Sequence, residues 1–100
     1  MKPFQLTKAA KNDLKGIAIY TEKQWGKTQR NIYLKQFDDV FHLLADNPGL
    51  GFDCEYIKEG YKKFPQGSHI IYYLEGTTST VLIVRVLHKR MDELTNLEST

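Results

Sequence analysis

The sequence predicts a single α+β domain with the element order β-α-α-β-β-β, in which a helical hairpin packs on a mostly antiparallel four-stranded sheet. Two stretches with helical periodicity come first, between residues 8 and 45, and Gly26 separates them. Stretches with strand character follow between residues 61 and 87, interrupted at Gly67 and from Gly76 to Ser79. Because short turns join neighbours in each group, the helices should lie antiparallel and the strands should form one sheet.

The N-terminal part predicts a short strand followed by the hairpin. Pro3 to Leu6 alternates apolar and polar residues, and Thr7 is placed to cap a helix over residues 8–25. The apolar stripe of this helix is formed by Ala10, Leu14, Ile17 and Ala18. The second helix, over residues 28–45, has a stripe formed by Tyr33, Phe37, Val40, Phe41 and Leu44. Pro48 ends it, because proline disfavours a helical conformation at the residue before it.

The C-terminal half predicts strands over residues 61–65, 68–74 and 80–87, after an irregular crossing segment at 50–60. In the last strand, simple alternation puts Val81, Ile83, Arg85 and Leu87 on one face. The same alternation puts Leu82, Val84, Val86 and His88 on the other. We expect the N-terminal strand to join this sheet, and the face away from the helices to be at least partly open.

Composition limits the kinds of protein that this chain can be. Hydrophobic residues make up 41% and aromatic residues 12%, which is typical of a folded domain, and the net charge of +2 demands no nucleic-acid partner. A lone Cys54, with neither a signal peptide nor an apolar span, predicts a cytoplasmic protein. We expect one domain over residues 1–100, with a core at about 2–92 and a tail at 93–100. No residue spacing resembles a metal site or a phosphate loop, so no cofactor is expected.

A few residues stand out as candidates for function. Arg85 interrupts an apolar strand, so it either pairs internally with an acidic side chain or loop carbonyls, or faces a partner. His88, Arg90 and Asp92 point the same way if the extended chain continues, and Met91 adds an adaptable apolar contact. Trp25 either closes the core or is an exposed anchor for a partner. His42 and His69 are isolated, and a structural role is expected for both.

The C-terminal half also resembles a known family. The stretch F-P-Q-G-S-H-I-I-Y, from Phe64 to Tyr72, and the stretch R-V-L-H-K-R-M-D, from Arg85 to Asp92, are similar to those of ParE toxins. These toxins belong to the RelE/ParE superfamily of bacterial toxin–antitoxin systems, which contribute to plasmid or chromosome stabilisation. The resemblance extends over nearly the whole chain and implies the same α+β fold.

The superfamily holds two functions on one fold, so the residues must decide between them. RelE-type members are ribosome-dependent mRNA endoribonucleases and need a proton acceptor, a proton donor and cations for the phosphate. Here Leu87 stands where a catalytic histidine is expected, His69 where an arginine is expected, and Lys63 and Arg85 are the cations on plausible faces. This departure favours the ParE branch, and the RelE-type activity is kept as the alternative.

The resemblance to ParE implies a protein that inhibits DNA gyrase by binding and traps its cleaved-DNA complex, without catalysis of its own. It also implies a cognate ParD-type antitoxin, DNA contact only through gyrase or the antitoxin, and no membrane partner. We assign target binding to Trp25, Arg85, His88, Arg90, Met91 and Asp92. We assign antitoxin binding to Leu14, Ile17, Val81, Ile83 and Leu87, of which the last three form an apolar stripe with surface to offer.

Overall fold

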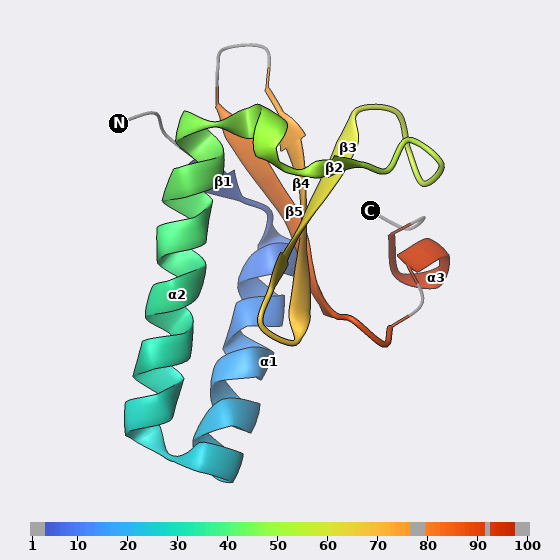
Figure 1. The fold of residues 1–100 in the computed structure, drawn as a ribbon. Coiled ribbons are helices and arrows are strands. Elements are labelled where there is room, and N and C mark those ends of the chain that lie inside the picture. The colour runs from blue at the N-terminus through green and yellow to red at the C-terminus, as the bar shows by residue number, and fades with distance from the viewer. Residues whose placement is uncertain (1–3, 77–79, 92, 98–100) are drawn as a thin grey trace.

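The structure, a computed structural model, describes residues 4–76, 80–91 and 93–97. Figure 1 shows a helical hairpin on one side of a twisted sheet and a short C-terminal helix beyond its other side. The hairpin consists of α1 (Lys8–Trp25) and α2 (Lys27–Asp46). Thr7 caps α1 as predicted, since its hydroxyl oxygen accepts from the Ala10 N–H at 3.0 Å. Gly26 separates the helices with φ +91°, in the region that favours glycine.

The part of the chain that the structure describes forms a five-stranded sheet in the order β1-β5-β4-β3-β2. The strands are β1 (Phe4–Leu6), β2 (Phe52–Asp53), β3 (Tyr61–Gln66), β4 (His69–Glu75) and β5 (Val81–His88). β1 runs parallel to β5, and the other neighbours are antiparallel. The expected fourth strand is therefore present as β1. The additional strand, β2, lies in the crossing segment that was expected to be irregular, after a single 3-10 turn at Pro48–Leu50 (η1).

Apolar side chains pack on both faces of the sheet. On the helix side, Phe37, Phe41 and Leu44 of α2 pack with Ile71 and Ile83 of the strands. The face expected to be at least partly open is covered in part, because Cys54 and Leu97 join a second cluster with Tyr61, Tyr72, Val84 and Leu87. Leu74 and Leu82 on the same face stay half-buried. Leu97 belongs to the short helix α3 (Glu93–Leu97) and is 1% exposed, so the segment predicted to be a tail from residue 93 onward contributes to the core.

A β-bulge in β5 changes which side chains face the helices. Tyr72 pairs with Arg85 while Tyr73 pairs with Ile83, so Val84 is an extra residue in the strand. The predicted grouping of β5 side chains by sheet face is correct up to Val84. After Val84 the grouping is reversed, because one extra residue shifts the two-residue alternation by one position. Leu87 therefore packs in the cluster away from the helices, although the alternation predicted it on the face of Val81 and Ile83. Val86 packs in the cluster beneath the helices with those two residues.

The chain turns immediately after β5. The Met91 N–H donates to the His88 carbonyl at 2.9 Å, and the Arg90 N–H donates to His88 Nδ1 at 3.2 Å. The extended chain on which a shared direction of His88, Arg90 and Asp92 depends does not continue past His88, because these bonds close a turn. Asp92 lies outside the described residues, as does Pro3 at the start of the predicted first strand.

Candidate functional site

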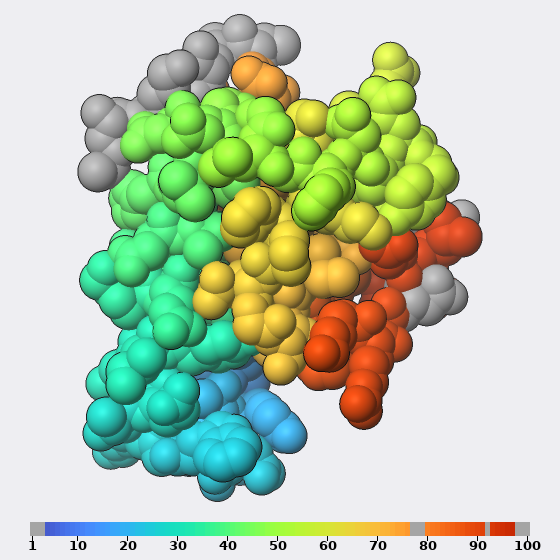
Figure 2. Space-filling view, in the orientation of Figure 1, coloured from blue at the N-terminus to red at the C-terminus, as the bar shows by residue number. Residues whose placement is uncertain are grey.

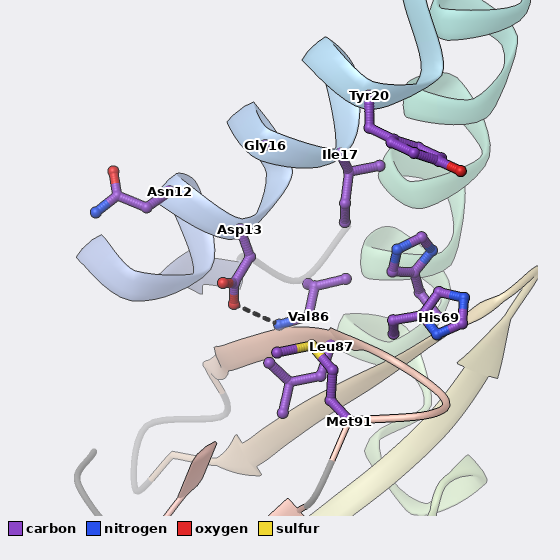
Figure 3. Close-up of a pocket in the computed structure, with 10 residues that line it drawn as sticks. Asn12, Asp13, Gly16, Ile17, Tyr20, His69, Val86, Leu87 and Met91 are labelled. Carbon is purple, nitrogen blue, oxygen red and sulfur yellow. Dashed lines mark hydrogen bonds between the residues drawn. The ribbon is translucent and has the colours of Figure 1, made fainter. Parts of the chain in front are cut away.

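Two adjoining pockets meet where α1 and α2 pass the β3–β4 turn and the end of β5. The larger, about 570 Å³, has Trp25 and Gln29 near the hairpin tip, and Ser68 in the β3–β4 turn, among its lining residues. The smaller, about 400 Å³, has Ile17 and Met91 among its lining residues (Figure 3). Tyr20, His69 and His88 line both pockets. We call the combined depression the histidine cleft.

A pair of imidazole rings lies at the centre of the histidine cleft. His69 and His88 are register partners on β4 and β5, and their ring centroids are 5.4 Å apart at an interplanar angle of 85°. Burial, and then the nearby His88, lower the pKa of His69 below its ordinary value. His69 is therefore neutral at pH 7 and can accept a hydrogen bond.

Tyr33 of α2 fixes this histidine and the turn beside it. Its hydroxyl lies 2.7 Å from His69 Nδ1, and it accepts from the Ser68 N–H at 3.2 Å. Gly67, at φ +59°, permits this approach, since a Cβ there would lie 2.6 Å from the Tyr33 hydroxyl oxygen. Burial raises the pKa of Tyr33, so the phenol keeps its proton. The β3–β4 turn is thus held against α2 by a polar contact.

Exposed apolar side chains stand around the histidine cleft. Trp25 is 72% exposed and Tyr20 64%, and Met91 is also exposed at the turn after β5. Of the two roles considered for Trp25, closing the core is excluded by this exposure. Trp25, His88 and Met91, predicted together as target-binding residues, do line the histidine cleft. Arg90 is exposed in the adjacent turn, and its place in a binding surface stays a prediction.

Arg85 pairs inside the molecule. Its guanidinium donates to the Asp13 carboxylate of α1 from Nε at 2.7 Å and from Nη2 at 2.9 Å. Its Nη1 donates to the Asn96 carbonyl at 3.0 Å. The hydrogen bond with Asp13 raises the pKa of Arg85. An acidic side chain and a carbonyl were the internal partners considered for this residue, and both are present. A role for Arg85 in target binding stays a prediction. A target that binds Arg85 would have to contact a largely buried guanidinium.

The stripe assigned to the antitoxin is not on the surface. Val81 and Ile83 are fully buried beneath the helices, Ile17 is 9% exposed and Leu14 is half-buried. Leu87 is 2% exposed and packs on the opposite face because of the bulge in β5. The expectation that Val81, Ile83 and Leu87 offer an exposed stripe is therefore wrong, and the assignment of the five residues to antitoxin binding stays a prediction.

Sequence reasoning also missed a polar cluster beneath α3. The Glu93 carboxylate accepts from the Tyr72 hydroxyl at 2.6 Å, the Tyr56 hydroxyl at 2.9 Å and Lys63 Nζ at 3.1 Å. Burial acts to raise the pKa of Glu93, but these three donors outweigh it and lower that pKa. Strand alternation puts Lys63 and Tyr72 on one face. Nothing in the sequence around Glu93 indicates that this carboxylate meets them.

The histidine cleft is lined by aromatic, apolar and polar side chains, with Asp13 as the acidic one. Among the described residues that line it, none is a lysine or an arginine. Cleavage of an RNA strand needs cations that stabilise the charge developing on phosphate. An exposed tryptophan and tyrosine beside polar groups are typical of protein-binding surfaces. No helix of the described residues is long and apolar enough to cross a membrane.

A two-helix hairpin packs on one face of this sheet, and an aromatic-rimmed cleft lies where the hairpin passes the β3–β4 turn and the end of β5. This arrangement defines a small α+β domain. The family model described as "ParE toxin of type II toxin-antitoxin system, parDE" matches residues 4–93. The chain therefore belongs to the ParE toxin family.

Named relatives extend over almost all of the chain. The protein named Toxin ParE1 from Caulobacter vibrioides is 36% identical over 97 residues, which are 97% of this chain and 99% of the relative. Toxin ParE1 from Mycobacterium tuberculosis is 37% identical over 94 residues, which are 94% of this chain and 96% of the relative. Toxin ParE from Escherichia coli is 30% identical over 97% of this chain and 94% of its own length.

A solved structure has the same fold. The chain from the chromosomal ParDE toxin–antitoxin system of P. aeruginosa superposes with a TM-score of 0.73 over 88% of this chain and 96% of that chain. At 13% identity, this likeness supports the fold alone. The predicted α+β class and the resemblance to ParE toxins are confirmed.

Proposed function

We propose that this protein is the toxin of a type II toxin–antitoxin system and that it inhibits DNA gyrase by binding, so that the cleaved-DNA complex of gyrase accumulates. Membership of the ParE family supports the toxin role. The observation that carries the binding mechanism is the histidine cleft, which combines the exposed Trp25 with lining residues that include neither lysine nor arginine. The protein thus acts as a ligand of its target and not as an enzyme.

The target surface in this proposal is the histidine cleft with the turn that follows β5. Trp25 and Met91 supply apolar contact area, His88 supplies a polar group between them, and Arg90 adds a charge at the edge. Arg85 supports this surface indirectly, because its contacts hold β5 to α1 and to the α3 segment. Asp92 belongs to the proposed set by its position in the sequence.

The test is a DNA cleavage assay with purified gyrase, plasmid DNA, ATP and this protein. Wild-type protein should convert plasmid to linear DNA that is covalently bound to gyrase. Trp25→Ala should reduce this at least tenfold at equal protein concentration, because hot-spot aromatics commonly contribute about 2 kcal/mol or more. Phe52→Ala is the matched control, since Phe52 is 64% exposed but lies on β2 and does not line the cleft.

A second variant tests the turn itself. Replacing Arg90 and Met91 together with alanine should abolish gyrase poisoning without unfolding the protein, because both side chains are exposed. A folded double variant with full activity would refute the target surface. A wild-type protein that is folded and leaves gyrase unaffected would refute the mechanism.

One observation favours the alternative, a ribosome-dependent mRNA endoribonuclease. The imidazoles of His69 and His88 meet edge to face in the cleft, and histidine pairs serve as acid and base in RNA cleavage. An assay of ribosome-bound mRNA with wild type and His88→Gln decides this. Cleavage that disappears in the variant would support the enzyme and would overturn the binding mechanism.

We further propose that a ParD-type antitoxin neutralises the protein. The P. aeruginosa structure comes from a chromosomal ParDE system, and this chain shares its fold. The antitoxin would bring a DNA-binding part and a segment that becomes ordered on the toxin, so that DNA is contacted only through the antitoxin or gyrase. Co-purification of the toxin with the ParD-type protein, and restored growth when both are expressed, are the expected results.

A further inference from the structure

The two imidazoles of the histidine cleft both turn Nδ1 toward the protein. The Tyr33 hydroxyl lies 2.7 Å from His69 Nδ1, and the Arg90 N–H donates to His88 Nδ1 at 3.2 Å. The β3–β4 turn, which precedes His69, is at the surface between α2 and the turn after β5 (Figure 2). Within the described part of the chain, no hydrogen bond is made to Nε2 of either ring. Nε2 is therefore the nitrogen of each ring that can meet a bound partner.

The turn after β5 fixes the tautomer of His88. The main-chain N–H of Arg90 can only donate, so His88 Nδ1 is the acceptor of this bond and carries no proton. In the neutral imidazole the single proton is then on Nε2. The half-buried His88 thus presents an N–H donor to the cleft that it lines.

The Tyr33 hydroxyl fixes the tautomer of His69 in the same way. This hydroxyl can donate its one proton to His69 Nδ1 at 2.7 Å or to the Gln66 carbonyl at 3.3 Å. The distance to the carbonyl exceeds the usual range for a hydroxyl donor, whereas the distance to Nδ1 is short. The hydroxyl proton is therefore directed to Nδ1, and the proton of the neutral His69 ring is on Nε2. The cleft then has two imidazole N–H donors.

Two such donors select a partner group that accepts hydrogen bonds. The ring centroids are 5.4 Å apart, and a carboxylate has two oxygens with about four lone-pair sites, so it can accept from both rings. Among the described residues that line the cleft, Asp13 is the acidic one, and its carboxylate already accepts from Arg85 and from the Val86 N–H. A phosphate fits less well, because arginine and lysine are its usual partners and neither lines the cleft.

The electrostatics of the pair also favour a carboxylate. Burial and the nearby His88 lower the pKa of His69, because both disfavour the charged ring. A carboxylate that accepts from the rings acts in the opposite direction, so they gain protons when it binds. Binding should therefore become tighter as the pH falls toward 6. The other titratable or charged groups around the pair are Asp13 and Tyr20 of α1, Tyr33 of α2 and Arg90 in the turn.

We infer that the histidine cleft binds a carboxylate side chain of gyrase, an aspartate or glutamate that lies next to an apolar residue, an assignment that rests on the proposed gyrase inhibition. The Nε2–H groups of His69 and His88 donate to the carboxylate oxygens. The apolar neighbour packs on Trp25, which is 72% exposed at the rim of the cleft.

The experiment compares two amides at position 88. The amide of glutamine takes the place of Nε2, whereas the shorter asparagine places its amide near Nδ1. Binding of the gyrase holoenzyme to immobilised toxin is measured by surface plasmon resonance at pH 7. His88→Asn should weaken the Kd at least about tenfold, because a hydrogen bond to a charged group contributes that much, and His88→Gln should recover most of the loss. The matched control is His42→Asn, since His42 is also half-buried but does not line the cleft.

Two further measurements test the acceptor and the tautomers. From pH 8 to pH 6 the wild-type Kd should decrease at least about threefold, and less in His69→Gln with His88→Gln, whose amides do not titrate in this range. An equal pH dependence in both proteins would overturn the carboxylate. Long-range ¹H–¹⁵N NMR of the toxin at pH 8 reports the tautomers directly, and a proton on Nδ1 of either ring would contradict the two donors.

The outcomes distinguish the inference from the function on which it rests. Each variant is used only if its thermal unfolding midpoint matches that of wild type. If His88→Asn binds as tightly as wild type, or no more weakly than His88→Gln, the carboxylate site is wrong although gyrase inhibition stands. If wild type itself does not bind gyrase, both are overturned.

Discussion

Removing Asp13 should destabilise the protein far more than removing an ordinary surface carboxylate. The Asp13 carboxylate accepts from Arg85 Nε at 2.7 Å, Arg85 Nη2 at 2.9 Å and the Val86 N–H at 2.9 Å. The side chains of Asp13 and Arg85 are 15% and 17% exposed. Asp13→Ala leaves a mostly buried guanidinium without its counter-charge, and such losses are about 3–5 kcal/mol. Because neither side chain is fully buried, we expect about 3 kcal/mol.

The bulge in β5 explains why the Asp13 carboxylate accepts a backbone hydrogen bond in addition to those from Arg85. β1 pairs with β5 as far as Ile83, and the Val84 carbonyl then accepts from the Thr7 hydroxyl at 2.7 Å. Past the extra residue, the Val86 N–H has Asp13 as its acceptor in place of a strand. Asp13 therefore supplies a hydrogen-bond acceptor to the edge of β5 as well as a counter-charge to Arg85.

Urea denaturation followed by circular dichroism gives the magnitude. With a slope of about 1.5 kcal/mol per M, a loss of about 3 kcal/mol moves the midpoint by about 2 M. Asp39→Ala is the control, because Asp39 and its partner Lys35 are 60% and 68% exposed. The loss of unfolding free energy in this variant should stay below about 0.5 kcal/mol.

A paired replacement tests the reason and not only the size of the effect. Asp13→Leu with Arg85→Met removes both charges and keeps apolar volume, so it should recover most of the lost stability apart from about 1 kcal/mol for the unpaired Val86 N–H. A loss below about 1 kcal/mol for Asp13→Ala, or a double variant no more stable than that single variant, would refute the reasoning.

Further predictions concern the pH dependence of stability and two glycine positions. The pKa of Glu93 in the folded state is lowered from 4.5. Its contribution to stability is therefore complete above pH 4.5 and is lost as the pH falls through the folded-state pKa. Glu93→Gln should remove this acid-dependent step from the pH profile of urea unfolding. The pKa of His69 is lowered from 6.5, so the folded state binds fewer protons and stability should decrease as the pH falls below about 6.5. His88→Gln should raise the pKa of His69 in an NMR titration, and an unchanged value would contradict the coupling. Gly16→Ala should stabilise α1 by up to about 1 kcal/mol because a Cβ there meets nothing within 4 Å. Gly51→Ala should destabilise by about 1–3 kcal/mol because its Cβ would lie 2.3 Å from a tyrosine hydroxyl, and equal unfolding midpoints for the two glycine variants would refute this contrast.

The candidate site could be predicted only in part. The sequence predicts Trp25, His88 and Met91 as target-binding residues, and all three line the histidine cleft. The helical pattern places Tyr33, which holds the cleft together, in the core stripe of α2. Its contact with His69 spans 36 positions in the chain, and no local pattern specifies such a pairing.

The sequence by itself determined the local structure of this protein. The Thr7 cap, the apolar spacing of the helices and the break at Gly26 place α1 and α2 within a residue or two of their bounds, because these features act over one turn of helix. The faces of β3 and β4 also follow from alternation alone.

Tertiary structure decided the features that depend on distant partners. The bulge in β5 reverses the faces after Val84, and Asp13, more than 70 residues earlier, supplies the acceptor that the bulged strand needs. The packing of α3 depends on Glu93 meeting donors from β3 and β4. Hydrogen bonds of this kind form because packing brings together buried donors and acceptors that lack partners within their own elements. No short stretch of sequence specifies these pairings, since the partners are distant in the chain.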